Sequence, residues 1–164
     1  MNFIKLTLVI SVVAISCKPE IKNVYVSDLI NESQQISAAK QIAELKKEGF
    51  EIFDYIDETS GDTIIMQQYF MAFLKSGPNR NQTKATADSL QTLHMAHLSS
   101  MYEKGFADIS GPFGDDGDMR GITIYNVPTM KIADSLAHLD PMVKAGRLII
   151  EIKPWWAGKG FPLR

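Results

Sequence analysis

Two stretches decide the fold of this 164-residue chain: Leu90-Gln91-Thr92-Leu93-His94 and Leu139-Asp140-Pro141-Met142-Val143. The first lies in a segment with apolar residues at helical spacing, so a buried stripe is expected at Leu90, Leu93, Leu98 and Met101. At about 100° per residue, His94 falls within that stripe and should face whatever the helix packs against. The second stretch predicts a helix start, because aspartate followed by proline is typical of an N-cap and first helical position.

Strand patterns flank these helices, and their order indicates an α+β fold. A strand apolar on both faces is expected over Thr63–Lys75, and Gly77-Pro78-Asn79 ends it in a turn. The elements that follow are a helix over Ala85–Lys104, strands over Phe106–Ser110 and Gly121–Val127, a helix capped by Thr129 and running through Leu139, and a strand over Leu148–Trp156. This β-α-β-β-α-β order predicts a ferredoxin-like domain with an antiparallel sheet.

The later strands alternate two kinds of side chain. Ile122 and Ile124 share one face of their strand, and Leu148, Ile150 and Ile152 share one face of the last strand. The alternating positions are expected to form one mixed, partly wet face, made of Thr123, Tyr125, Glu151 and Lys153. Such a face beside an apolar first strand suits packing against a second copy of the chain, so a homodimer is expected.

The N-terminus has the pattern of an exported lipoprotein. Residues 1–16 combine a basic start with an apolar run that is too short to span a bilayer, which needs about 20 apolar residues. The single cysteine, Cys17, follows Ala14-Ile15-Ser16, which resembles a lipobox. Lipidation of Cys17 would attach the protein to a membrane of the bacterial cell envelope. The alternative is an incidental thiol beside an ordinary signal peptide.

The remaining chain divides into three expected parts. Residues 17–36 are polar and suit a tether, and residues 37–62 are expected to form an accessory element with a helix over Ser37–Glu48 and a strand over Phe50–Ile56. The domain itself is expected over 63–164.

Several motifs together resemble the YCII-related (YciI-like) domain family over roughly 63–156. They are the two opening stretches with Gly77-Pro78-Asn79-Arg80, Gly111-Pro112-Phe113, Asp115-Asp116-Gly117-Asp118-Met119-Arg120-Gly121 and Lys153-Pro154-Trp155-Trp156. The resemblance implies a ferredoxin-like subunit of a dimeric α+β barrel, with one histidine and one aspartate paired in a small pocket. Those positions here are His94 and Asp140. It also implies elimination or isomerisation without a cofactor, because relatives of this fold include a dehydrochlorinase and lactone isomerases.

Both residues of this pair also have a purely structural interpretation. His94 could be a core histidine that is satisfied by a backbone carbonyl, and Asp140 could serve only as a helix cap. The capping role is compatible with a catalytic one, because a carboxylate beside an imidazole holds the ring in one tautomer. His97 lies in the same stripe but matches no motif position, so we expect it to be a structural neighbour.

Four further residues are candidates for contact with a substrate: Arg80, Asp118, Arg120 and Tyr69. Arg80 ends the first strand and could meet an anionic group or only hold its turn. Asp118 and Arg120 lie in the hairpin loop that the resemblance places next to the pocket. The aspartates of this loop do not have the EF-hand spacing for calcium, and a turn explains them.

Other functional classes have little support in the composition. The formal net charge is -2, and no basic stripe indicates a nucleic-acid partner. Nucleotide-binding, hydrolase and zinc motifs are absent from the sequence, so we expect no metal and no cofactor. The favoured hypothesis is an enzyme in which His94, oriented by Asp140, acts on a small molecule. The alternatives are a non-catalytic envelope protein that binds a small ligand, and a scaffold whose pocket is closed by side chains.

Overall fold

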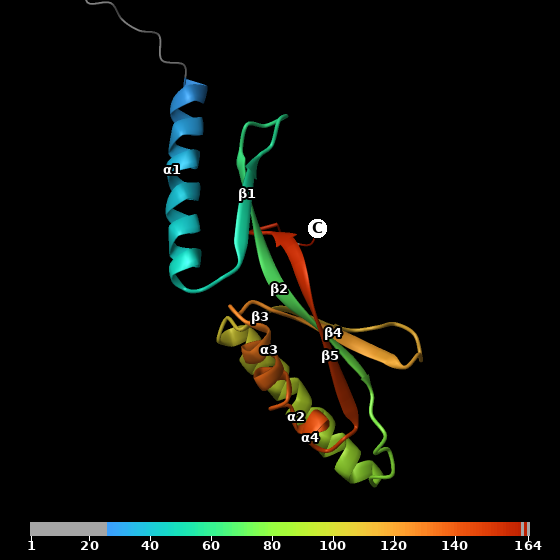
Figure 1. Ribbon diagram of the computed structural model, residues 1–164. Helices are drawn as coiled ribbons and strands as arrows, with labels where there is room; N and C mark the ends of the chain where they lie inside the picture. The colour runs from blue at the N-terminus through green and yellow to red at the C-terminus, as the bar shows by residue number, and fades with distance from the viewer. Residues whose placement is uncertain (1–25, 162, 164) are drawn as a thin grey trace, which may run out of the picture.

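The computed structural model describes the backbone of residues 26–161 and residue 163, and the side chains from residue 37 onward (Figure 1). Its elements are α1 (Val26–Lys47), β1 (Ile52–Ile56), β2 (Thr63–Ser76), α2 (Lys84–Glu103), β3 (Ala107–Pro112), β4 (Met119–Tyr125), α3 (Met130–Ala137), α4 (Pro141–Lys144) and β5 (Leu148–Gly158). From β2 to β5 the order is β-α-β-β-α-β, with the single turn α4 placed before the last strand. The predicted element order is therefore confirmed.

Strand β2 is the centre of a five-stranded antiparallel sheet. β5 pairs with one edge of β2 over most of its length, from Met66 to Ser76. The other edge is shared by β1, which pairs with the first residues of β2, and β4, which pairs with its second half and carries β3 on its outer side. Apart from β1, the strand order β5-β2-β4-β3 is that of a ferredoxin-like fold.

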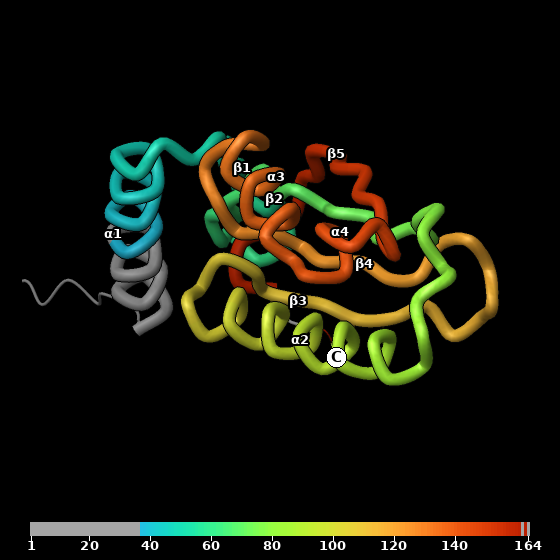
Figure 2. Tube along the Cα trace, turned by 90° about the horizontal axis from the view of Figure 1, so that it is seen from below, coloured from blue at the N-terminus to red at the C-terminus, as the bar shows by residue number. Residues whose placement is uncertain are grey.

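Helices α2 and α3 cover one face of this sheet and enclose the main core, and α4 packs beside them. The core is formed by β2, β4, α2 and α3, with Phe70, Ala72, Met101, Tyr125, Ala133 and Ala137 among its buried members. Figure 2 shows α2 running alongside β3, beneath the sheet in that view. The expected stripe of α2 is only partly buried. Met101 is 4% exposed, but Leu93 is 50% exposed, because the helix lies at the margin of the core.

The opposite face of the sheet has a different composition from the one predicted. Thr123 pairs with Ala72, whereas Glu151 pairs with Phe73, the next residue along β2, so the two side chains point to opposite faces. Thr123 and Tyr125 are buried under the helices, while Glu151 and Lys153 lie on the helix-free side. The mixed face expected from these four residues is therefore wrong. The face away from the helices instead carries Met71, Phe73, Ile122, Ile149, Trp155, Glu151 and Lys153.

The N-terminal helix is longer than the sequence predicted. α1 begins at Val26 and not near Ser37, so it extends into the segment expected as a tether, and it contacts β1 and β2 rather than α2–α4 (Figures 1 and 2). The predicted signal peptide and Cys17 lie outside the described residues. Among the described helices, none is both long enough and apolar enough to cross a bilayer.

A close backbone contact joins the end of β2 to the start of β5. The amide of Gly77 donates to the carbonyl of Arg147 at 2.8 Å, and the amide of Asn79 donates to the carbonyl of Gly146 at 3.0 Å. A Cβ on Gly77 would lie 2.2 Å from the Gly146 carbonyl oxygen, so only glycine fits there. The contact holds the two loops that follow β2 and precede β5 against each other.

Replacing Gly77 by alanine should therefore destabilise the fold. We expect Gly77→Ala to lower the free energy of unfolding by about 1–3 kcal/mol, because the backbone must shift to admit the methyl group. Gly114→Ala is the matched control, since a Cβ there meets nothing within 4 Å, and it should change stability by about 0.5 kcal/mol or less. Urea unfolding measures both. Equal midpoints for the two variants would show that the β2–β5 contact is not tight.

Candidate functional site

His94 projects from the buried side of α2. Thr83 caps the helix by accepting a hydrogen bond from the amide of Thr86, which fixes the start of the helix and so the direction of each later residue. His94 is 8% exposed and faces the sheet, as its position in the apolar stripe predicted. A histidine in this position needs a polar partner, because an unpaired buried imidazole is costly.

Asp140 supplies that partner while also capping α4. One carboxylate oxygen, Oδ1, accepts from the amide of Met142 at 2.8 Å, and the other, Oδ2, lies 2.6 Å from Nδ1 of His94. Asp140 is 2% exposed, so its carboxylate is satisfied by the protein rather than by water. The predicted capping role is thus present together with the histidine contact. The two residues are 46 positions apart in the chain, and the fold brings them into hydrogen-bond contact.

The carboxylate determines which nitrogen of His94 is available for chemistry. Because a carboxylate accepts hydrogen bonds, Nδ1 carries the ring proton and donates a hydrogen bond to Asp140. In the neutral ring the lone pair is then on Nε2, on the opposite edge of the imidazole. Nε2 has no hydrogen-bond partner within the described part of the chain. His94 is thereby held as a proton acceptor with one free nitrogen.

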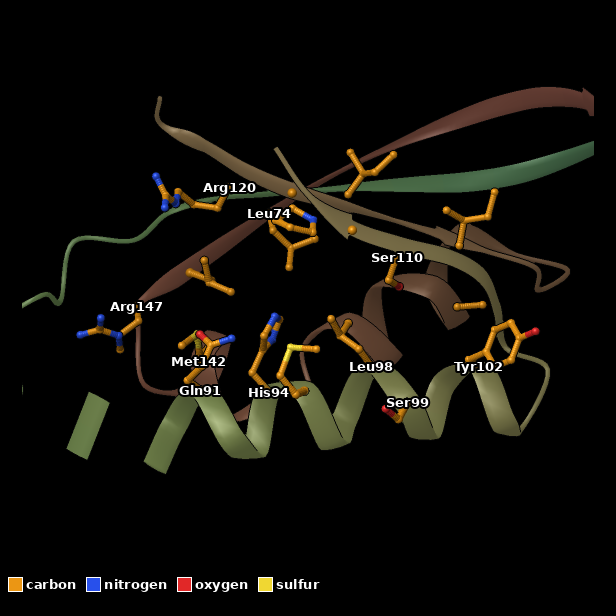
Figure 3. Close-up of a pocket in the computed structure, with 18 of the residues that line it drawn as sticks. Leu74, Gln91, His94, Leu98, Ser99, Tyr102, Ser110, Arg120, Met142 and Arg147 are labelled. Carbon is orange, nitrogen blue, oxygen red and sulfur yellow. The ribbon is translucent and has the colours of Figure 1, made fainter. Parts of the chain in front are cut away.

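A cavity of about 970 Å³ lies between α2 and the sheet, and His94 is on its wall. Asp140 does not line it, so the carboxylate sits behind the ring and the free edge of the ring faces the cavity. Figure 3 shows His94 rising from α2 into this space, with Leu74 on the sheet side. The lining combines apolar side chains with polar and charged ones, and a concave site with both kinds of group suits a small molecule. The scaffold hypothesis required a pocket that is closed by side chains, whereas this cavity is open.

The structure brings two of the four predicted substrate contacts to this cavity. Arg80 and Arg120 both line it. Asp118 does not, and its carbonyl instead accepts from the amide of Ser76. Tyr69 points to the other face of the sheet, where it is 5% exposed and its ring lies 6.3 Å from that of Trp155. Tyr69 and Asp118 are therefore not placed to contact a ligand in this cavity.

Burial also limits the chemistry available to Tyr69. Removal from water, together with the nearby carboxylate of Asp108, raises the pKa of Tyr69 to about 12. The phenol therefore stays protonated at neutral pH. It is a packing residue of the sheet, not an acid–base group of the cavity.

His97 lies one helical turn from His94 but has a different environment. Its Nε2 is buried without a hydrogen-bond partner among the described residues. Burial lowers the pKa of His97, and the Asp140 carboxylate opposes this only in part. His97 does not line the cavity, which agrees with its expected role as a structural neighbour.

Sequence reasoning did not single out Arg147, although it brings a third guanidinium group to the cavity. It lies in the loop between α4 and β5, lines the cavity and donates from Nη1 to Oε1 of Gln82 at 2.7 Å. In the sequence it follows the Leu139-Asp140-Pro141-Met142-Val143 stretch by four residues, and no local pattern there indicates a binding role. Among the described residues, no group of three or more His, Cys, Asp or Glu side chains could hold a metal ion.

Comparisons with known proteins add little to this geometry. No protein-family model matches the chain, and no curated protein matches it either. One similar solved structure is 5-chloro-2-hydroxyhydroquinone dehydrochlorinase from Burkholderia phenoliruptrix, in complex with 2,5-dihydroxybenzoquinone. It is 23% identical, the match covers 53% of this chain and 92% of that chain, and the TM-score is 0.41. A likeness this distant says nothing about activity, and the fold assignment rests on the strand order.

Replacing Asp140 by asparagine should reverse the tautomer of His94. The asparagine oxygen can still cap the amide of Met142, so its amino group must face Nδ1, which becomes an acceptor and leaves the proton on Nε2. The ¹⁵N chemical shifts of the neutral ring report this change directly. His138, whose Nδ1 lies 2.9 Å from the carbonyl of Asp134, is the internal control and should not change. An unaltered His94 spectrum in Asp140→Asn would mean that Asp140 does not orient the ring.

Proposed function

We propose that this chain is a YCII-related enzyme that moves a proton on a small organic molecule, with His94 as the acid–base group and Asp140 as its positioning residue. The observation that carries the proposal is the 2.6 Å contact between Nδ1 of His94 and the buried carboxylate of Asp140, with the free edge of the ring on a cavity wall. The family resemblance paired these two positions, and their contact supports that assignment.

The chemistry follows from the state of the ring. Neutral His94 accepts a proton at Nε2 from a substrate carbon that lies next to an electron-withdrawing group. Asp140 stabilises the imidazolium that forms, because a carboxylate and a cation attract strongly at this distance in a buried site. In an elimination, the electron pair of the broken C–H bond forms a double bond and expels a leaving group. In an isomerisation, the imidazolium returns the proton to another carbon of the same molecule.

A binding protein without catalytic activity is the alternative. The same cavity could hold a small ligand without any proton transfer, and its wall of apolar and polar side chains suits that role. The buried His94–Asp140 pair favours the enzyme. An ionisable pair taken out of water costs free energy that apolar packing would not, so a function of the pair explains why it is there.

We also propose that the helix-free face of the sheet packs against a second copy of the chain. Of its residues, Ile149 is 46% exposed and Trp155 is 41% exposed, which is unusual for side chains of this size in a sheet. Glu151 is paired with both Lys75 and Lys153 within the chain, so its carboxylate has partners on this face and only one net positive charge remains there. An isologous dimer would bury this face.

Removing the imidazole of His94 should abolish proton transfer and leave ligand binding nearly intact. We expect His94→Gln to slow hydrogen–deuterium exchange into a small carbon acid by about 10²- to 10⁴-fold, as is typical for loss of a general base. NMR of a panel of small ketones, hydroquinones and lactones in D₂O measures the exchange. His138→Gln is the matched control, because His138 is exposed and lies outside the cavity.

Exchange at the wild-type rate in His94→Gln would contradict the enzymatic role. Ligand binding without any turnover in the wild-type protein would favour the binding-protein alternative.

A charge on the helix-free face should break the proposed dimer. We expect the wild-type chain to have the mass of a dimer and Ile149→Asp to have the mass of a monomer, because an isologous interface would bury the new carboxylate twice. Light scattering after size-exclusion chromatography measures both masses. Ile132→Asp is the control, since Ile132 is 40% exposed but lies on α3, away from this face. A monomeric wild-type chain would refute the dimer.

A further inference from the structure

Three arginines meet at one end of the cavity: Arg80, Arg120 and Arg147. Each lies at or just beyond a different strand end. Arg80 follows β2, Arg120 is the second residue of β4 and Arg147 precedes β5. Because β4 and β5 both run antiparallel to β2, the end of β2 lies beside the starts of the other two strands. The topology therefore gathers three guanidinium groups that are far apart in the sequence.

None of these guanidinium groups has a carboxylate partner within the described residues. Nη1 of Arg80 donates to the carbonyl of Arg147 at 3.3 Å, and Nη1 of Arg120 donates to the carbonyl of Gly117 at 3.1 Å. Arg147 donates to the amide oxygen of Gln82, and its Nε is buried without a partner. All three thus contact only neutral oxygens. No carboxylate in the described part of the chain neutralises their positive charge.

The positive charges that line the cavity lie at one of its ends. Figure 3 shows Arg120 and Arg147 at one end, His94 next to them, and Leu98 and Tyr102 toward the other end. One acidic residue, Glu103, follows Tyr102 toward that other end. Asp108 also borders the cavity, but its carboxylate accepts a hydrogen bond from the side chain of Asn126 at 3.2 Å and lies near Tyr69, on the opposite face of the sheet. A ligand in the cavity therefore meets a cationic end beside the imidazole and a more apolar end beyond it.

We infer that the arginine end of the cavity binds the carboxylate of a small organic acid, and that this acid is the substrate class of the site. That the bound acid is a substrate rests on the proposed function. The anion site itself follows from the three guanidinium groups, which have no carboxylate partner among the described residues. Guanidinium forks match the planar carboxylate with two parallel hydrogen bonds. The unpartnered buried Nε of Arg147 is one donor available for such a contact.

A carboxylate in this position would orient the substrate for proton transfer. With its charged group held by the arginines, the adjoining carbon lies toward His94, and the apolar remainder extends toward Leu98 and Tyr102. Loss of the proton to Nε2 of His94 leaves negative charge on the substrate. The same arginines stabilise that charge, since fixed cations in a partly desolvated site act strongly on charge that develops nearby. Arg147, Arg120 and Arg80 are thus binding residues that also favour the reaction.

The test compares two ligands of the same shape and different charge. Benzoate and benzamide are titrated into the full-length protein, and NMR chemical shifts of the His94 ring and the arginine side chains give each dissociation constant. We expect benzoate to bind at least tenfold more tightly than benzamide, because only benzoate carries the anionic group. Inorganic phosphate is titrated separately. Phosphate that binds at least as tightly as benzoate would overturn the carboxylate assignment.

Variants then locate the binding site. Arg147→Gln and Arg120→Gln should each weaken benzoate binding by about tenfold and leave benzamide binding unchanged. The guanidinium of Arg120 donates to a carbonyl of its own hairpin loop, so Arg120→Gln tests the site even if Arg147→Gln does not fold. Lys131→Gln removes the same unit of charge from α3, outside the cavity, and is the control. Benzoate binding that is absent, or that survives both arginine changes, overturns the inference.

Failure of this inference can be told apart from failure of the proposed function. Benzoate binding is also measured in His94→Gln, which lacks the acid–base group. Benzoate binding that depends on the arginines, in a protein that catalyses no exchange, would leave the anion site intact and remove the enzymatic role. Exchange in the wild-type protein, together with benzoate binding that is absent or that survives Arg147→Gln and Arg120→Gln, would keep the enzymatic role and remove the anion site.

Discussion

The structure of the site depends on the burial of one carboxylate. Asp140 is 2% exposed, and a carboxylate so far from water is tolerated only when hydrogen-bond donors surround it. Its two oxygens take one donor from α4, the amide of Met142, and one from α2, Nδ1 of His94. The contact therefore joins two helices at a defined distance. It also fixes the ring of His94, so that the free nitrogen lies on the cavity wall.

The antiparallel sheet places this pair next to a second feature that no single segment contains. Gly77 lets the loop after β2 approach the loop before β5, and the hydrogen bonds between these loops hold Arg80 beside Arg147. Arg120 joins them because β4 starts where β2 ends. An imidazole with one free nitrogen thus stands at the cationic end of a cavity whose other end is more apolar. Proton abstraction generates negative charge, and this distribution of charge suits it.

Local sequence signals predicted the elements and their caps well, and the family resemblance supplied the pairing of His94 with Asp140. Thr129 caps α3 and Asp140 caps α4 as expected, because a cap is a contact between residues two or three apart. Long-range packing was predicted less well. Leu93 belongs to the apolar stripe by spacing but is 50% exposed, since spacing gives the direction of a side chain and not the extent of the layer that covers it. Tyr69 was expected at the pocket, but it is on the opposite face of β2.

The sequence by itself determined the order of helices and strands, their caps and the identity of the two residues in the buried pair, because these depend on short-range periodicity and on motif positions. Only the tertiary structure decided which face of each strand meets the helices. Alternation separates Thr123 from Ile122 within one strand, but the pairing with Ala72 is what turns Thr123 toward the core. The three-arginine end of the cavity was decided in the same way. Its members lie on different strand ends, and their proximity follows from the cross-strand register, which the chain acquires only when the sheet forms.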